Sequence, residues 1–489
     1  MNIYGMVKEV ADNKSKNIAY IYNGNKINYE ELMSSCENIA HILVENKIEK
    51  GDKIAILLGN SPEFVQTYLA ILKLGAIVIP LNPSFTESEL SYILKDSATK
   101  LVIATSDQKE KLKSVKKQCH TLLNIILIDE IKQNEIVNIQ LEEIEIGQND
   151  TAVILYTSGT TGNPKGAMLS HSNLIENASD FTKLIELSDS DRMIAVLPMF
   201  HSFCLTLCVN MILLNGASTI IIPKFNPAEL VEVIKKEKAT LIAAVPTIYN
   251  YLYQLKSATA NDFRTLRACI SGGASIPLEL LQSIQEKYNI LIVEGYGLSE
   301  TAPVLTFNPY RGICKPGSVG LDLPSVETKI FNENGEEVPS GEVGEVVAVG
   351  PNVMRGYLNK IEETEKAFIN GWFKTGDLGK KDEDGYLFLL DRKKDVIITN
   401  GYNVYPREIE ERLYEHQNII EAAVVGKPDQ LIGESVCAYL VVSNDSLSES
   451  EIIDFCKKAL VYYKVPKEIY FVKELPKNST GKILKRKLR

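Results

Sequence analysis

The feature that most constrains the fold is an alternation of short apolar segments with segments of helical periodicity. Residues 53–59 and 76–82 are continuous apolar segments typical of buried strands, and residues 62–74 between them have the apolar spacing of a helix. A strand, a helix and a second strand in this order predict a β-α-β unit with parallel strands. The alternation continues through residues 151–158, 217–223 and 239–246, so the sequence predicts an α/β fold.

Two further patterns predict how the chain is divided. Residues 18–28 contain two β-segments around Asn23-Gly24, which predicts a hairpin. From about residue 315, glycine turns such as Asp384-Gly385 and short β-segments predict a β-rich subdomain. A charged run begins at Asp391, and about a hundred residues of mixed helix and strand follow it. We therefore expect a large N-terminal domain of layered α/β subdomains plus a β-rich subdomain at 1–391, and a small α+β C-terminal domain at 392–489.

Composition excludes several classes of function. The chain has 489 residues and a formal net charge of −10, which does not favour a general partner of nucleic acids or anionic membranes. The longest apolar stretches are too short to span a bilayer, and the N-terminus lacks the apolar segment of a signal peptide, so we expect no integral membrane segment and a cytoplasmic protein. Cys204 and Cys208 have no nearby histidine or second cysteine pair, which favours buried thiols over a zinc site.

The segment YTSGTTGNPKG at 156–166 is the strongest chemical signal. Small residues allow backbone N–H groups to point into one anion site, while hydroxyl groups and a lysine add further donors. This chemistry suits a polyphosphate. The spacing differs from the common P-loop, because Pro164 replaces the second glycine and Gly166 follows the lysine. The expected phosphate-binding residues are Thr157, Ser158, Gly159, Thr160, Thr161, Gly162 and Lys165.

The order S-G-T-T-G-x-P-K-G resembles the signature of the acyl-adenylate-forming superfamily, which includes acyl- and aryl-CoA synthetases, firefly-type luciferases and adenylation domains of peptide synthetases. Further segments occur in the family's order, so the resemblance spans nearly the whole chain. It is similar in particular to bacterial medium- and long-chain fatty acyl-CoA synthetases. The resemblance implies ATP, Mg²⁺ and coenzyme A as cofactors, and a small-molecule carboxylic acid as substrate.

The resemblance also implies roles for two internal motifs. The turn Gly272, Gly273 and Ala274 would lie against the adenine and the acyl group, although an ordinary tight turn explains it equally well. In EGYGLSET (294–301), the resemblance implies that Tyr296 and Gly297 bind the adenine, that Thr301 donates to the α-phosphate, and that Glu300 binds Mg²⁺. The Leu-Ser variant of this motif resembles the CoA-ligase side of the superfamily.

The remaining implied residues lie toward the C-terminus. Asp377 and Arg392 would bind the ribose. Lys394 would be a hinge about which a mobile C-terminal domain turns, and Gly401 would face the thiol tunnel; a charged interdomain linker is the simpler alternative. Lys482 matches the family's adenylation lysine, which neutralises charge on the α-phosphate. The basic residues after it are either a solvated tail or a contact for CoA phosphates.

The acyl pocket is expected at residues 197–215, 272–273 and 296–304. The segment around residue 200 is mostly apolar, which favours a fatty or aryl acid over an amino acid. His201 is either beside the substrate carboxylate or a core histidine. His171 is expected to be structural, and Trp372, the only tryptophan, to pack in the core.

The sequence thus predicts an acid–thiol ligase that forms acyl-AMP, releases pyrophosphate and then makes an acyl-CoA thioester. The alternatives are an aryl- or succinylbenzoyl-type CoA ligase, an enzyme that loads an acyl carrier protein, and a catalytically inactive nucleotide-binding scaffold. Because every expected catalytic position is filled, including Lys482, the scaffold is disfavoured.

Overall fold

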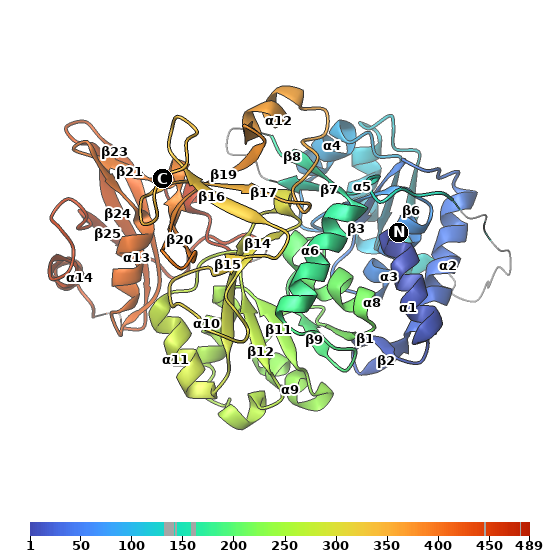
Figure 1. Cartoon of the computed structure of the whole chain (residues 1–489), viewed down its shortest axis with the longest axis horizontal. Coiled ribbons are helices and arrows are strands. Elements are labelled where there is room, and N and C mark those ends of the chain that lie inside the picture. The colour runs from blue at the N-terminus through green and yellow to red at the C-terminus, as the bar shows by residue number, and fades with distance from the viewer. Residues whose placement is uncertain (132–140, 142–143, 158–162, 445, 480) are drawn as a thin grey trace.

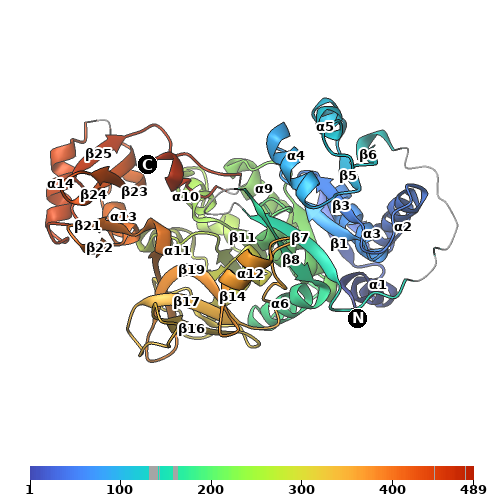
Figure 2. The same ribbon diagram turned by 90° about the horizontal axis from the view of Figure 1, so that it is seen from above.

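The computed structural model describes residues 1–131, 141, 144–157, 163–444, 446–479 and 481–489 (Figure 1). These residues form four sheets with helices packed against them. The first sheet lies at one end of the molecule and the C-terminal sheet at the other, as Figure 1 and Figure 2 show. The mixed α/β architecture, with α/β layers, a β-rich part and a separate C-terminal sheet, confirms the predicted fold class.

The first sheet is built by the predicted β-α-β alternation. Its order is β6-β5-β3-β4-β7-β8, and all neighbouring strands are parallel except β8, which is antiparallel to β7. Both faces are covered, because alternate residues of β3 enter two different hydrophobic clusters. The elements are β3 (Lys53–Leu57), α3 (Pro62–Lys73), β4 (Ile77–Pro80), α4 (Glu87–Asp96), β5 (Leu101–Ala104), α5 (Lys109–Lys116), β6 (Asn124–Leu127), β7 (Thr151–Thr157) and β8 (Lys165–Ser170), with α2 (Tyr29–Glu45) beside α3.

The second sheet is the largest, with the order β15-β14-β13-β12-β11-β9-β10-β1-β2. The predicted hairpin is present as β1 and β2, and Asn23 and Gly24 have φ of 50° and 82°, as a tight hairpin turn requires. The strands are β1 (Ile18–Tyr22), β2 (Asn25–Asn28), β9 (Arg192–Ala195), β10 (Ser218–Ile221), β11 (Leu241–Ala244), β12 (Ala268–Ser271), β13 (Ile292–Gly297), β14 (Val304–Phe307) and β15 (Leu321–Asp322).

The helices of this part pack their apolar sides into one large core shared by the first two sheets. They are α1 (Ile3–Asn13), α6 (His171–Leu184), α7 (Ser202–Cys204), α8 (Met211–Asn215), α9 (Pro227–Glu237), α10 (Pro246–Gln254) and α11 (Leu278–Tyr288). A π-helical stretch, η3 (Leu205–Asn210), joins α7 to α8. Cys204 and Cys208 lie buried there as free thiols, and the described residues contain no group of three or more His, Cys, Asp or Glu arranged for a metal.

The β-rich part and the C-terminal part each have a sheet of their own. The first comprises β16 (Glu327–Phe331), β17 (Gly344–Val349), α12 (Ile361–Ala367), β18 (Phe368–Ile369), β19 (Trp372–Lys381) and β20 (Leu387–Arg392). The second comprises β21 (Ile397–Thr399), β22 (Tyr402–Val404), α13 (Pro406–Tyr414), β23 (Ile419–Asp429), β24 (Gly433–Val442), α14 (Glu449–Lys457) and β25 (Glu468–Phe471). Residues between Ile397 and Ile469 form a separate hydrophobic core, so this part has the character of a domain. The boundary at 391/392 and the hinge at Lys394 stay predictions.

The structure corrects two expectations about local packing. The phosphate-loop segment does not run from a strand directly into a helix; it joins β7 to β8, and α6 begins only at His171. Residues 165–170 extend because they pair with β7 and bury Ala167 and Leu169. Trp372 is only partly buried at the start of β19, where its ring meets Phe331.

His171 has a structural role in this fold. It is buried, and its Nδ1 accepts a hydrogen bond from the backbone N–H of Ile3 at 3.3 Å. Burial lowers the pKa of His171 to about 4, so the ring is neutral at pH 7. Among the described residues, no helix is both long and apolar enough to cross a bilayer.

One buried carboxylate ties together the edge of the second sheet where β9, β11 and β12 begin. Asp191 is 4% exposed and accepts two hydrogen bonds from the Arg267 guanidinium, at 2.8 and 2.9 Å, and one from the Thr240 hydroxyl at 2.7 Å. Arg267 itself precedes β12 and Thr240 precedes β11. The pKa of Asp191 is lowered: burial raises it, but the bonds from Arg267 and its neighbours outweigh that effect.

We predict that Asp191→Ala lowers the free energy of unfolding by about 3 kcal/mol, because it leaves the partly buried Arg267 without its carboxylate. Urea unfolding followed by circular dichroism measures the loss. The control is Glu232→Ala, which removes an exposed partner of Lys235 and is expected to cost less than about 0.5 kcal/mol. Equal losses for the two variants would contradict the assigned role.

Candidate active site

Four segments far apart in sequence meet where strands of different sheets end. They are the end of β7, the β13–η5 segment that contains the EGYGLSET motif, the paired strands β19 and β20, and the C-terminal loop that carries Lys482. The elements come from three sheets and the chain end, so no single unit holds the site. Side chains at strand ends are held by a rigid scaffold, which is how binding sites are commonly built.

Asp377 is the centre of this arrangement. Asp377 on β19 faces Arg392 on β20 in the strand register. Its Oδ1 is 3.0 Å from Arg392 Nε, and its Oδ2 accepts a hydrogen bond from the Tyr296 hydroxyl at 2.6 Å. Burial and the Asp377 charge raise the pKa of Tyr296, so the phenol stays a neutral donor. A carboxylate has about four acceptor positions, so Asp377 retains capacity for ribose hydroxyls.

Glu300 is held by two hydroxyl groups. The Tyr357 hydroxyl donates to Glu300 Oε1 at 3.0 Å, and the Thr157 hydroxyl donates to the same atom at 3.3 Å. Lys165 follows the loop on β8, and its Nζ lies 5.3 Å from the centre of the Tyr357 ring. The predicted phosphate residues Thr157 and Lys165 therefore flank the predicted metal ligand. Ser158, Gly159, Thr160, Thr161 and Gly162 lie outside the described residues.

Glu300 fits the requirements of Mg²⁺, which keeps several waters and takes one or two carboxylates together with substrate phosphates. The two printed bonds both use Oε1, and the carboxylate points to the segment that precedes the phosphate loop. A lone, hydroxyl-supported carboxylate suits a metal that arrives with a nucleotide. The site contains no cluster that would hold the metal by protein ligands alone among the residues that the structure places.

Two glycines of the predicted nucleotide site are sterically required. A Cβ on Gly297 would lie 1.7 Å from the carbonyl oxygen of Pro303, so no larger residue fits without moving the backbone. A Cβ on Gly272 would lie 3.1 Å from the Phe203 ring. Gly273 has φ of +77° and is exposed, and Ala274 follows it at the end of β12. The glycine turn thus stands beside a ring from the predicted acyl pocket.

Thr301 differs from the expectation. It is fully buried, and its hydroxyl donates to the Pro303 carbonyl at 2.6 Å and to the Leu298 carbonyl at 3.1 Å. Its own carbonyl accepts from Asn352 Nδ2 at 2.8 Å. In this conformation Thr301 fixes the turn that follows Gly297. Donation to an α-phosphate would require the hydroxyl to leave these backbone acceptors.

Lys482 and His201 lie in one electrostatic environment. Burial, followed by the charge of Arg392, lowers the pKa of Lys482 to about 8, while Asp377 and Asp395 oppose this effect. Burial and the Lys482 charge lower the pKa of His201 to about 4. Its Nδ1 accepts from the Phe203 N–H at 3.3 Å, which leaves the proton of the neutral ring on Nε2, as a donor. The arrangement brings one ammonium and one neutral imidazole to the Asp377 carboxylate.

The two residues assigned to domain movement are placed differently. Lys394 is exposed in the short helix η6 (Lys393–Asp395), next to Arg392, and burial with nearby positive charges lowers its pKa. Gly401 is at the exposed tip of the β21–β22 hairpin, with φ of +82° and free space around it. Its place in a thiol tunnel stays a prediction. The basic tail is docked, since Arg489 pairs with Asp395 at 2.8 Å and Lys485 with Glu410 at 2.8 Å.

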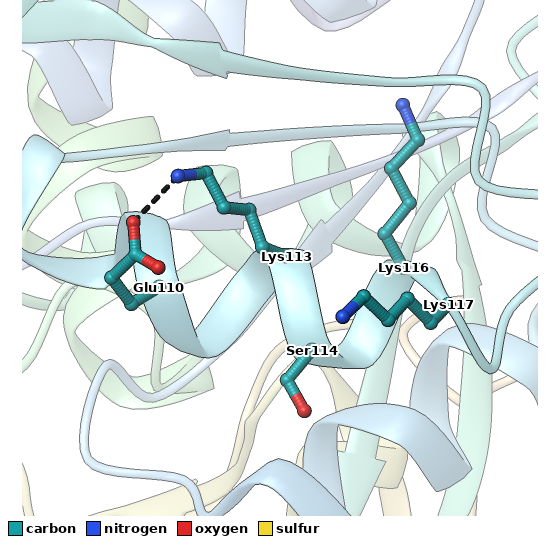
Figure 3. A pocket seen from close by; sticks show the side chains of 5 residues that line it. All are labelled: Glu110, Lys113, Ser114, Lys116 and Lys117. Carbon is teal, nitrogen blue, oxygen red and sulfur yellow. Dashed lines mark hydrogen bonds and ion pairs between the residues drawn. The ribbon is translucent and has the colours of Figure 1, made fainter.

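Tyr357 was not found by sequence reasoning. It follows Gly356 in a connection between β17 and α12 and belongs to none of the recognised motifs. A hollow elsewhere, on α5, is lined by Glu110, Lys113, Ser114, Lys116 and Lys117, with Lys113 bonded to Glu110 at 2.6 Å (Figure 3). None of these residues belongs to the site described above.

Comparison with known proteins agrees with this geometry. The chain matches the model of the AMP-binding enzyme family over residues 7–358 and that of the AMP-binding enzyme C-terminal domain over residues 408–482. It is 37% identical to a protein of Bacillus subtilis named long-chain-fatty-acid–CoA ligase, over 96% of this chain and 91% of that one. The crystal structure of ATP-bound MatB from Rhodopseudomonas palustris matches with a TM-score of 0.94 at 33% identity, covering 100% of this chain and 98% of that one.

The apo structure of the same MatB matches with a lower TM-score of 0.84, at 34% identity and the same coverage. The resemblance found in the sequence motifs is therefore confirmed, over both the large and the C-terminal part of the chain. The protein belongs to the family of AMP-binding enzymes, the acyl-adenylate-forming superfamily.

Proposed function

We propose that this enzyme is an AMP-forming acyl-CoA synthetase that joins a fatty acid to coenzyme A at the cost of ATP. The observation that carries the proposal is the placement of Lys482 beside Asp377, Arg392 and His201. Relatives named long-chain-fatty-acid–CoA ligase support the class of reaction. The higher similarity to the ATP-bound than to the apo form of MatB supports the view that the C-terminal part stands in its adenylating orientation.

The substrate class follows from the segment after His201. Phe203, Leu205 and Leu207 are buried with other apolar side chains of the helical stretch 202–215, and the Phe203 ring lies against Gly272. An apolar pocket that opens beside a neutral histidine suits an acid with a hydrocarbon body and a single polar end. We propose a medium- or long-chain fatty acid.

The first half-reaction needs positioning and charge stabilisation. An oxygen of the substrate carboxylate attacks the α-phosphorus of ATP, the bond to the β-phosphate oxygen breaks, and acyl-AMP and pyrophosphate form. Lys482 neutralises charge on the α-phosphate, His201 Nε2 orients the carboxylate, and Asp377 and Tyr296 hold the nucleoside. Glu300 would hold Mg²⁺, which supplies positive charge to the phosphates.

The second half-reaction transfers the acyl group. The C-terminal domain turns about Lys394, withdraws Lys482 and presents the Gly401 hairpin. The sulfur of coenzyme A attacks the acyl carbonyl carbon, the bond to the AMP oxygen breaks, and AMP leaves while the thiol loses its proton. Only this rotation allows one site to perform both steps. A carrier-protein pantetheine presents the same thiol, and the acceptor is an outcome of the assay.

We predict that Lys482→Ala lowers the rate of acyl-AMP formation at least about 100-fold, because a single donor to developing charge contributes on this scale. The same variant should form thioester from supplied acyl-AMP and coenzyme A at a rate within about 2-fold of the wild type. Single-turnover assays of each half-reaction measure the two effects. Loss of both steps, or of neither, would contradict the role of Lys482.

The pKa of Lys482 predicts a pH dependence. The charged form stabilises the transition state, so kcat/KM for ATP in the adenylation step should fall as pH rises through about 8, by about 10-fold per unit at higher pH. Thioester formation from supplied acyl-AMP lacks this limb. In Lys482→Arg the guanidinium stays charged, so whatever activity remains should not fall near pH 8. An unchanged limb in the arginine variant would assign it to another group.

A pyrophosphate-release assay tests the substrate class. Acids of 6 to 18 carbons, aryl acids and amino acids are compared, each with and without coenzyme A. We expect kcat/KM for the best fatty acid to exceed that for the aryl and amino acids by about 100-fold, since each buried methylene contributes about 0.8 kcal/mol. A preference for aryl acids would favour an aryl-CoA ligase, and turnover only with an acyl carrier protein would favour a loading enzyme.

A further inference from the structure

One face of α10 is used to contact the C-terminal part of the chain. Thr247, Asn250 and Tyr251 are spaced i, i+3 and i+4, and therefore share a face of the helix. The Thr247 hydroxyl donates to the carbonyl of Gly481 at 2.9 Å, and Asn250 Nδ2 donates to the carbonyl of Ile420 at 3.2 Å. The Tyr251 ring lies under the Lys477 ammonium, 5.7 Å from its centre. None of these three residues belongs to a motif that suggested the function.

The Thr247 contact fixes the residue immediately before Lys482. Gly481 has φ of +86°, and a Cβ on it would lie 3.3 Å from Val245 Cγ2 and 3.6 Å from Thr247 Cβ. The backbone at Gly481 is therefore seated directly on the beginning of α10. Because the hydroxyl bond ends on the carbonyl of Gly481, it defines the orientation of the peptide unit that leads into Lys482.

The loop around Lys482 is braced internally, so it moves as a unit. Asn478 Oδ1 accepts from the Lys482 N–H at 2.9 Å, the Asn478 N–H donates to the Lys482 carbonyl at 2.9 Å, and Lys477 forms a bridge to Ile483. A contact at Gly481 therefore positions the whole loop. Val245 also contacts the predicted adenine turn, since a Cβ on Gly273 would lie 3.4 Å from Val245 Cγ1.

We infer that Thr247 is a positioning residue of the adenylation half-reaction: its hydroxyl holds the Gly481 carbonyl and thereby sets the Lys482 ammonium beside Asp377 and Arg392. The inference rests on the proposed function for its kinetic consequence. Thr247 lies in the large domain and Gly481 in the C-terminal one, so the bond exists only while the two are docked in this orientation. Rotation toward thioester formation breaks it, and Thr247 has no role in that step.

The test compares Thr247→Val, which removes the hydroxyl and keeps the shape of the side chain, with Thr247→Ser, which keeps the hydroxyl. We expect the valine variant to form acyl-AMP about 10-fold more slowly, since a lost hydrogen bond corresponds to about 5-fold and a displaced catalytic group to more. Thioester formation from supplied acyl-AMP should stay within about 2-fold of the wild type. The serine variant should recover adenylation to within about 2-fold.

A matched control is Thr182→Val. The Thr182 hydroxyl also donates to a backbone carbonyl, that of Ala178 at 2.8 Å, but inside α6 and away from the interface. This variant should leave both half-reactions unchanged. If the Thr247→Val and Thr182→Val variants slow adenylation equally, or if Thr247→Val slows both half-reactions equally, the loss reflects stability and the inference is wrong.

Amide hydrogen exchange gives a readout that does not depend on the substrate. In the full-length protein without ligands, a peptide covering residues 476–484 should exchange about 5-fold faster in Thr247→Val than in the wild type, and Thr247→Ser and Thr182→Val should match the wild type. Unchanged exchange in Thr247→Val overturns the inference. A wild type that releases no pyrophosphate with any acid overturns the proposed function instead, and leaves the exchange result to decide whether Thr247 holds the loop.

Discussion

The Asp377 carboxylate is the interaction on which the site depends. It is buried at the junction of two sheets, where it accepts a hydrogen bond from Tyr296 and pairs with Arg392. Tyr296 extends from the parallel sheet and Asp377 from the antiparallel one, so a single carboxylate fixes the distance between the aromatic platform and the sugar-binding position. Removing it would leave Arg392 without its partner and separate the two sheets at the point where the nucleotide is expected.

The same region concentrates positive charge. Lys482, Arg392 and Lys394 share it with Asp377 and Asp395, and the imbalance explains why the pKa of Lys482 falls to about 8. Such a site is costly when empty and becomes favourable when phosphates bring negative charge, because each ammonium or guanidinium then gains a partner. Neutral His201 fits this arrangement, since a second cation beside Lys482 would raise the cost further.

Contacts between the large part and the C-terminal part are polar and individually weak. Thr247 and Asn250 each donate one hydrogen bond, and Glu411 on α13 accepts from the Leu278 N–H at the start of α11 at 3.2 Å. The C-terminal part keeps its own hydrophobic core throughout, so it can change orientation without losing its fold. An interface of exchangeable hydrogen bonds over a rigid core is what a two-step enzyme requires if one domain is to serve two states.

The sequence by itself determined the elements and the chemistry. Apolar periodicity is a local property, so β3, α3 and β4 and the hairpin at Asn23-Gly24 were predictable, and contiguous motifs identified Tyr296, Asp377 and Lys482 together. Only the tertiary structure decided how they combine. The pairing of β1 with β10 joins residues about two hundred positions apart, the β7–β8 hairpin depends on a partner strand, and the burial of Thr301 depends on the turn at Pro303. Tyr357 and Thr247 carry no sequence signal, because a hydroxyl that supports Glu300 or Gly481 acquires its role from its neighbours in space.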